Sequence, residues 1–176
     1  LVELKKLKEE LDKVDIAYIT TFDAYALSLV KQYNHVAKTL DYTVPIGEYD
    51  EPRRQEQGLL TIDLAKGNIG IIGQPGSGKE MLISTIIWSS MIEHTPYEIN
   101  HYIIDFGAET LKKFAKFPHV GEVVFQSEPD RFSGVLDIVM EILEERKTLF
   151  QEYNGSFEYY NSVSPNKVPL ICVTIN

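Results

Sequence analysis

The chain has 176 residues, of which 44% are hydrophobic, and a formal net charge of −9. This length and apolar content are enough for one compact domain with a buried core. An acidic domain is poorly suited to hold a nucleic-acid backbone, because phosphates are normally contacted by lysine and arginine. The single cysteine, Cys172, excludes a disulfide framework and a cysteine-based zinc site within this sequence. No stretch approaches the roughly 20 apolar residues that a bilayer span requires.

Residues 1–44 are predicted to form a linker segment that contains a helix, a short strand and a second helix. The first helix is indicated by apolar residues at helical spacing, namely Leu4, Leu7, Leu11 and Val14. The strand is predicted at Ile16–Thr20, and a second helix with one apolar face follows, up to Leu40. We expect the first apolar stripe to dock on a neighbouring domain, since exposed stripes of this kind usually meet a partner.

A polar segment rich in turn formers follows, and we place the start of the second domain, residues 45–176, near Pro45. Within it, Tyr49–Gln57 combines several carboxylates and carboxamides with Arg53 and Arg54. This segment is suited either to a charge-paired contact with an adjacent domain or to a solvated loop.

From residue 59 onward, predicted strands alternate with predicted helices. The strands are expected at Leu59–Leu64, Asn68–Ile72, His101–Asp105, Gly121–Phe125 and Val168–Ile175. The helices are expected at 78–93, at Ala108–Phe117 and after the capping-box pattern Ser127–Asp130, and a polar loop is expected at Glu152–Lys167. This alternation predicts a three-layer α/β fold with a mainly parallel sheet.

The order of burial in this sheet can also be predicted. Strands that are covered on both faces have near-continuous apolar sequences. We therefore expect the strands ending at Ile72, Asp105 and Ile175 to be central, and the strand after Leu59 to lie at or near an edge. The four histidines lack metal-ligand spacing, and we interpret each as structural.

One motif carries chemistry. It matches the P-loop pattern G-x-x-x-x-G-K-[ST] except at its last position, and its residues are Gly73, Gln74, Pro75, Gly76, Ser77, Gly78, Lys79 and Glu80. A buried strand is expected before it and a helix after it, as the motif requires. Glycines let the backbone point its N–H groups at phosphate oxygens, and the helix N-terminus adds positive charge. We expect these eight residues to bind nucleotide phosphates, with Lys79 reaching the β- and γ-phosphates.

Two departures concern the Mg²⁺ ion that normally accompanies the nucleotide. Glu80 stands where a serine or threonine hydroxyl usually coordinates the ion. The second nucleotide motif is an apolar strand that ends in aspartate, but Val168–Ile175 is followed by Asn176. An asparagine offers no anionic ligand and cannot act as a base. Both departures predict that Mg²⁺-dependent hydrolysis is lost and that no residue has an assigned catalytic role.

Asp105 begins the tripeptide Asp-Phe-Gly, which also occurs in protein kinases, but the partner motifs of kinases are missing. Asp105 ends a predicted strand, at the edge where α/β folds gather ligands. Either a turn role or a ligand role is open at this position.

Several segments together resemble the FtsK/SpoIIIE ATPases, and most of all a later ATPase domain of the EssC/EccC-type motor of bacterial type VII secretion. They are Pro45–Gln57, Gly67–Gly73, Tyr102–Gly107 and Phe117–Val124, and the likeness extends over Pro45–Asn176. The resemblance implies a cytoplasmic domain of a bacterial plasma-membrane protein that contains tandem ATPase domains. It also implies, as partners, neighbouring ATPase domains of the same chain and small secreted helical-hairpin proteins, and an oligomeric full-length motor.

Three functions follow from these residues. The first is a degenerate ATPase-like domain that binds ATP weakly or statically and serves regulation, assembly or substrate recognition. The second is an active ATP-driven DNA translocase, which the acidic composition and the two departures from the motifs disfavour; we expect no nucleic-acid partner. The third is a nucleotide-free module that binds a partner, for example a peptide at the sheet edge. Whether the domain is an enzyme is left open by the sequence.

Overall fold

The computed structural model describes residues 41–176. The chain divides into two units, Leu1–Ala37 and Lys38–Asn176, so the described residues all belong to the second. The predicted linker covers residues 1–44, and its two helices and its strand lie outside the described residues, as does His35. The boundary near Pro45 therefore stays a prediction. Within residues 41–176, no helix is long and apolar enough to cross a bilayer.

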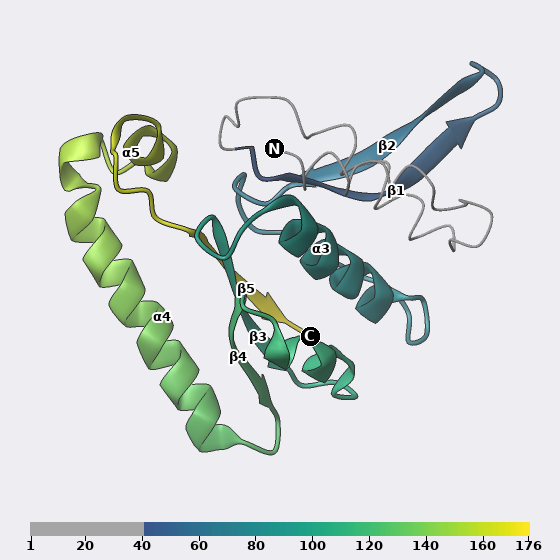
Figure 1. Cartoon of the computed structure of the whole chain (residues 1–176). Coiled ribbons are helices and arrows are strands. Elements are labelled where there is room, and N and C mark those ends of the chain that lie inside the picture. The colour runs from purple at the N-terminus through teal and green to yellow at the C-terminus, as the bar shows by residue number, and fades with distance from the viewer. Residues whose placement is uncertain (1–40) are drawn as a thin grey trace, which may run out of the picture. The chain divides into compact units, whose positions relative to one another are not determined.

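The described unit contains two small sheets and several helices (Figure 1). The strands are β1 (Thr43–Glu51), β2 (Glu56–Asp63), β3 (Ile99–Asp105), β4 (Val120–Phe125) and β5 (Leu170–Ile175). The α-helices are α3 (Lys79–Glu93), α4 (Pro129–Leu149) and α5 (Phe157–Val163), and the 3-10 helices are η2 (Thr110–Lys116) and η3 (Gln151–Tyr153).

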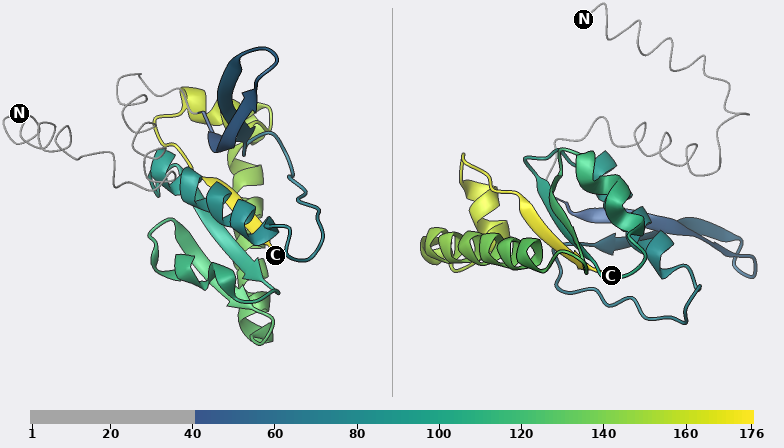
Figure 2. Two further views of the ribbon diagram at one scale, coloured as in Figure 1. Left: turned by 90° about the vertical axis from the view of Figure 1, so that its right-hand side faces the viewer. Right: turned by 90° about the horizontal axis from the view of Figure 1, so that it is seen from below.

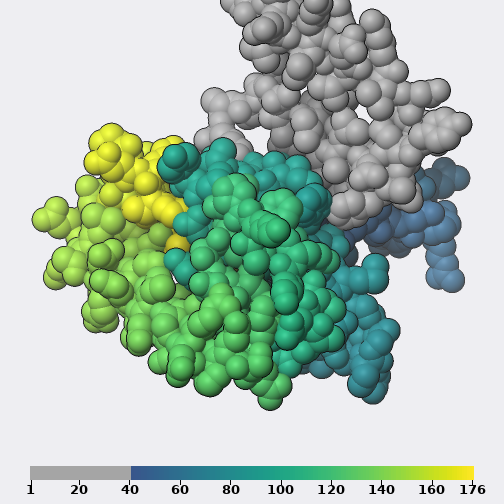
Figure 3. All heavy atoms as spheres, turned by 60° about the horizontal axis from the view of Figure 1, so that its bottom comes forward, coloured from purple at the N-terminus to yellow at the C-terminus, as the bar shows by residue number. Residues whose placement is uncertain are grey.

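The first sheet is the antiparallel hairpin β1–β2, which replaces the predicted polar segment after Pro45. Its register runs from Thr43 opposite Asp63 to Glu51 opposite Glu56, with a bulge between Pro45 and Gly47. The predicted strand at Leu59–Leu64 is thus confirmed within β2, but it belongs to this separate hairpin and not to the edge of the parallel sheet. The hairpin lies on the opposite side of the unit from α4 (Figures 1 and 3).

The second sheet is parallel and has the strand order β4-β3-β5. Its faces are covered by helices, with α3 and η2 on one side and α4 on the other (Figure 2). One buried cluster joins α3, β3, β4 and η2 through Ile87, Ile103 and Phe114, and a second joins β3, β4 and α4 through Ile104, Val124 and Val135. This is the predicted three-layer α/β arrangement, with β3 central as expected.

Two of the three strands predicted to be central take other places. β5 lies at one edge of the described sheet. Asn68–Ile72 forms no strand at all, and its Ile72 side chain is 100% exposed. An apolar run becomes a strand only when a neighbour satisfies its backbone groups. This run has β5 as a neighbour on one side, and a cavity of about 400 Å³ separates the two.

Three predictions about the helices and loops differ in part from the structure. The predicted capping box fails because the N-cap is Glu128, not Ser127, and no side chain caps this helix end. The Glu128 carboxylate instead accepts from the Phe125 backbone N–H and pairs with Arg131. The predicted loop Glu152–Lys167 contains α5, whose N-cap Ser156 does accept from the Tyr159 N–H at 3.1 Å. The predicted helix at Ala108–Phe117 is the 3-10 helix η2.

Candidate functional site

The Gly-rich motif forms a tight turn that leads directly into α3. Gly76 (φ 74°) and Gly78 (φ 88°) both adopt left-handed backbone conformations. A residue with a Cβ atom would be strained in this conformation. At Gly73 a Cβ atom would lie 2.5 Å from the Ser77 hydroxyl oxygen, which would have to rotate away. The backbone conformation of the turn therefore depends most on Gly76 and Gly78.

The N-terminal end of α3 points its free backbone N–H groups out of this turn. The first helical hydrogen bond runs from Leu82 N to Gly78 O at 3.0 Å. The N–H groups of Lys79, Glu80 and Met81 precede that bond and so have no intrahelical acceptor. Together with the helix dipole, they make this end of α3 attractive to an anion.

Lys79 is held inside the turn by backbone carbonyls. Its Nζ donates to Gly73 O at 2.7 Å and to Gln74 O at 3.4 Å. Among residues 41–176, no ion pair joins Lys79 to the half-buried Glu80. The amine thus sits beside the first turn of α3 without being neutralised by its neighbour.

Asn176, which directly follows β5, makes three hydrogen bonds to the end of β3 and to the residue after it. Its backbone N–H donates to Ile104 O at 2.9 Å, and its carbonyl accepts from Phe106 N at 2.8 Å. Its side-chain Nδ2 donates to the Asp105 carboxylate at 2.8 Å. The amide is therefore fixed by β3 as well as by β5.

Asp105 closes the turn after β3. It is 1% exposed, and its carboxylate accepts from the backbone N–H of Gly107 at 3.0 Å and of Leu111 at 3.1 Å. Of the two roles that the sequence left open for it, the turn role is confirmed. Its contact with Asn176 was missed, although a signal existed: the carboxyl ends of adjacent parallel strands meet at one edge, and both strands end in a polar residue.

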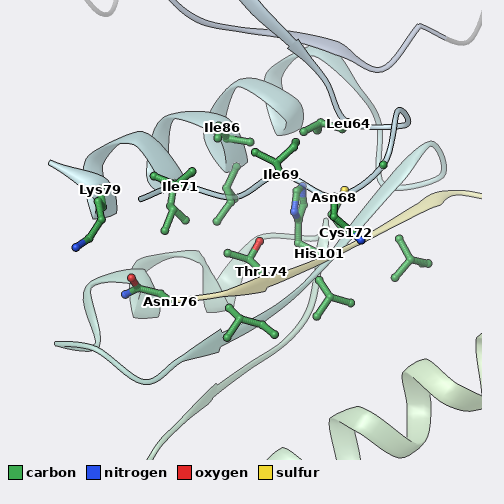
Figure 4. A pocket seen from close by; sticks show the side chains of 16 residues that line it. Leu64, Asn68, Ile69, Ile71, Lys79, Ile86, His101, Cys172, Thr174 and Asn176 are labelled. Carbon is green, nitrogen blue, oxygen red and sulfur yellow. The ribbon is translucent and has the colours of Figure 1, made fainter. Parts of the chain in front are cut away.

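Lys79 and Asn176 line one cavity of about 400 Å³ between α3, β5 and residues 67–71. Figure 4 shows Lys79 and Asn176 at the same end of this cavity, with Cys172 further along β5 and His101 beside it on β3. Burial raises the pKa of the Cys172 thiol to about 12, so this thiol is neutral near pH 7 and a poor nucleophile.

Most side chains that line the cavity are apolar, and Lys79 is the residue of the glycine-rich turn that reaches it. The described residues that line it contribute one cation, Lys79, and no carboxylate. Among residues 41–176, no group of three or more histidine, cysteine, aspartate or glutamate side chains could hold a metal ion. Phosphate oxygens would meet Lys79 and the α3 N–H groups, whereas a divalent cation would find no anionic ligand within this lining.

His101 marks the closed side of the site and belongs to a buried polar cluster. Its Nε2 lies 2.8 Å from the Ser90 hydroxyl, which itself donates to Ile87 O at 2.7 Å. The hydroxyl therefore accepts from His101, which requires the neutral Nε2–H tautomer. Burial, with smaller contributions from His119 and His94, lowers the pKa of His101 to about 4.

Comparison with known protein families gives a match over most of the chain. Residues 34–173 match the sequence model of the FtsK/SpoIIIE family. The ESX-1 secretion system protein EccCb1 of Mycobacterium tuberculosis is 37% identical over 121 residues, which cover 67% of this chain and 20% of that protein. The type VII secretion system protein EssC of Staphylococcus aureus is 30% identical over 148 residues, which cover 83% of this chain and 10% of that protein. The chain thus spans a fifth or less of the length of these relatives.

Two solved structures that are similar to this chain contain ATPases 2 and 3 of EssC or EccC proteins. EssC (ATPases 2 and 3) from Geobacillus thermodenitrificans matches with a TM-score of 0.69 and 30% identity, over 76% of this chain and 26% of that one. Thermomonospora curvata EccC (ATPases 2 and 3), in complex with a signal sequence peptide, matches with a TM-score of 0.72 and 27% identity, over 81% and 27%.

Proposed function

Because the chain belongs to the FtsK/SpoIIIE family, we propose that it is a degenerate ATPase-like domain of a type VII secretion motor. In this proposal, residues 73–80 bind the phosphates of a nucleotide without depending on Mg²⁺, and the domain hydrolyses ATP slowly or not at all. Its homology to the ATPase domains of EccC and EssC supports the motor. The state of its nucleotide site supports the degeneracy.

The observation that carries the proposal is a glycine-rich turn beside Lys79 and the α3 N–H groups, together with an amide at position 176, where the second nucleotide motif normally has an aspartate. On the phosphate side, Gly76 and Gly78 have the required backbone conformations, and Lys79 stands beside the free N–H groups of α3. On the metal side, the Asn176 side-chain amide donates a hydrogen bond to Asp105. Bound Mg²⁺ would normally neutralise charge that develops on the transferred phosphoryl group, and this lining offers nothing to hold it.

Three protein-level expectations follow from the relatives. The domain would act on the cytoplasmic side of a membrane-anchored protein, next to other ATPase domains and as part of an oligomer. Its partners would be those domains and small secreted proteins, since one related EccC structure contains a signal sequence peptide. Its contribution would be regulation, assembly or substrate recognition, and not translocation of DNA.

The test is a titration of the purified chain with ATP, once with Mg²⁺ and once with a chelator. We expect comparable affinity in both, and loss of binding in Lys79→Ala. A matched control is Lys113→Ala, which removes a lysine from η2 instead of from the turn. Absence of ATP binding under both conditions would favour a nucleotide-free module that binds a partner.

Hydrolysis is a separate measurement. We expect phosphate release well below the roughly 1 s⁻¹ or more of a working ATPase, because neither Glu80 nor Asn176 reproduces the usual Mg²⁺ ligands. Turnover in the working range that Lys79→Ala abolishes would contradict the degeneracy and would revive the active-motor alternative.

A further inference from the structure

The hydrogen bond between Asp105 and Asn176 fixes which way the Asn176 amide points. A carboxylate can only accept hydrogen bonds, so the NH₂ group of the amide must face Asp105. The amide oxygen and the second N–H are then left for other partners. Asn176 lines the cavity that also contains Lys79, and in Figure 4 its amide oxygen is turned towards the side of α3.

The same contact places a negative charge directly behind residue 176. Asp105 ends β3, and the adjacent strand β5 leads into Asn176, so the carboxylate lies 2.8 Å from the amide that occupies the usual aspartate position. Three N–H groups hold it there, from Gly107, Leu111 and Asn176. A carboxylate held by three donors and 1% exposed has a fixed place in the fold.

We propose that Asp105 is a positioning residue of the phosphate site. It orients the Asn176 amide towards the cavity, and it carries on β3 the negative charge that related nucleotide sites carry at the end of β5. On this view the asparagine is matched to Asp105, because a neutral amide can donate to a carboxylate and a second carboxylate cannot. This inference rests on the proposed function, since it assumes that phosphates bind at residues 73–80.

Gly107 is the third part of this arrangement. A Cβ atom at position 107 would lie 2.9 Å from Asn176 Nδ2 and 3.3 Å from Asp105 Oδ1. A methyl group there would have to push the amide away from the carboxylate. Gly107→Ala therefore displaces Asn176 while both polar residues and the total charge stay unchanged.

The first experiment tests the pair itself, without any ligand. The side-chain NH₂ protons of Asn176 should exchange slowly with water in a series of ¹⁵N–¹H correlation spectra, and Gly107→Ala should remove this protection. Free exchange in the wild-type protein would overturn the inference, whatever the protein binds.

The second experiment measures ADP affinity with Mg²⁺ and with a chelator, in the full 176-residue chain. Wild type should bind ADP about equally in both. Gly107→Ala and Asp105→Asn should weaken binding about tenfold. The exchange variant Asp105→Asn/Asn176→Asp moves the charge from β3 to the end of β5, and it should bind ADP at least about tenfold more tightly with Mg²⁺ than without.

The matched control is Glu109→Gln. It removes the same charge from the same turn, but Glu109 is exposed and pairs with Lys112 at 3.5 Å. It should leave ADP affinity and its Mg²⁺ dependence unchanged. If Asp105→Asn and the exchange variant do not fold, because the Gly107 and Leu111 N–H groups lose their carboxylate acceptor, Gly107→Ala still decides.

The outcomes separate two failures. If the wild-type chain binds no ADP, the proposed function fails and the phosphate role of Asp105 fails with it. If wild type binds ADP but Gly107→Ala binds equally well, or the exchange variant stays independent of Mg²⁺, then only the positioning role is refuted. A merely structural Asp105 would change thermal stability and leave the Mg²⁺ dependence untouched.

Discussion

The parallel sheet is covered less completely towards its β5 edge than around β3 and β4. On the β3–β4 side, Ile103 and Ile104 are almost fully buried because α3 and η2 pack on one face and α4 on the other. On the β5 side, Ile175 is 66% exposed and Ile72 entirely so. Both sides are equally apolar in sequence, so apolar character alone does not decide burial. The nucleotide-type turn lies on the open side, where a ligand can still reach the backbone.

The largest expected effect compares two isoleucines across this divide. Ile103→Ala should lower the free energy of unfolding by about 2–5 kcal/mol, because it leaves a cavity in a closed cluster. Ile72→Ala should change it by less than about 0.5 kcal/mol, because that side chain is fully exposed. Urea unfolding of both variants measures the difference. Equal losses would show that residues 68–72 are packed in solution, and the contrast between the two sides would disappear.

The buried strand β3 should also respond to acid through His101. Burial lowers its pKa from about 6.5 to about 4 in the folded protein. Between these two values the unfolded chain holds a proton that the folded protein does not, so stability falls as pH falls from about 6.5 to 4 and then levels off. The loss is about 3 kcal/mol at most. Unfolding measured at several pH values should show a shallower slope in His101→Gln, and parallel slopes would contradict the assignment.

The open side should gain most from an anion. Phosphate or sulfate without Mg²⁺ should raise the melting temperature, because Lys79 and the α3 N–H groups bind only in the folded state. At a ligand concentration 100 times the Kd, the gain would be about 2.7 kcal/mol. Lys79→Ala should abolish it, and an equal rise in that variant would point to a general salt effect.

The smallest effect on stability is expected at the tip of the β1–β2 hairpin. Arg54 pairs with Glu51 at 3.4 Å, but both side chains are largely exposed, so the pair contributes little. Arg53→Ala/Arg54→Ala should leave unfolding within about 0.5 kcal/mol of wild type. It should nevertheless weaken association with an adjacent ATPase domain by about 1 kcal/mol or more if the contact is desolvated. Unchanged co-purification of the flanking domains would contradict this role.

The sequence predicted the elements that are defined by their own apolar pattern, and it failed where an element depends on a pairing partner. The expected positions of four elements, β3, β4, α3 and α4, agree with the structure. Their apolar patterns predict buried faces, and these faces are buried in the fold. The run Asn68–Ile72 has the same pattern, yet pairing depends on a backbone partner that the pattern does not describe. β1 was not predicted because its sequence is polar and rich in turn formers. It forms a strand because it pairs with β2.

The candidate site shows the same division. The turn at residues 73–80 could be predicted because its geometry is encoded locally, by glycines at fixed spacing before a helix. The contact between Asp105 and Asn176 joins residues 71 positions apart, and it depends on β3 and β5 being neighbours. Spacing along the chain contains no information of that kind.

The chain also contains its own optical reporter. Its one tryptophan, Trp88, lies on α3, the helix that begins at the nucleotide-type turn. The indole packs edge-on against Phe117, with 5.3 Å between ring centroids, and in a tilted arrangement against Phe114, with 6.4 Å. Any shift of α3 relative to η2 changes the surroundings of this single ring. Intrinsic fluorescence can therefore follow movement of the helix in real time, without a dye and without an added label.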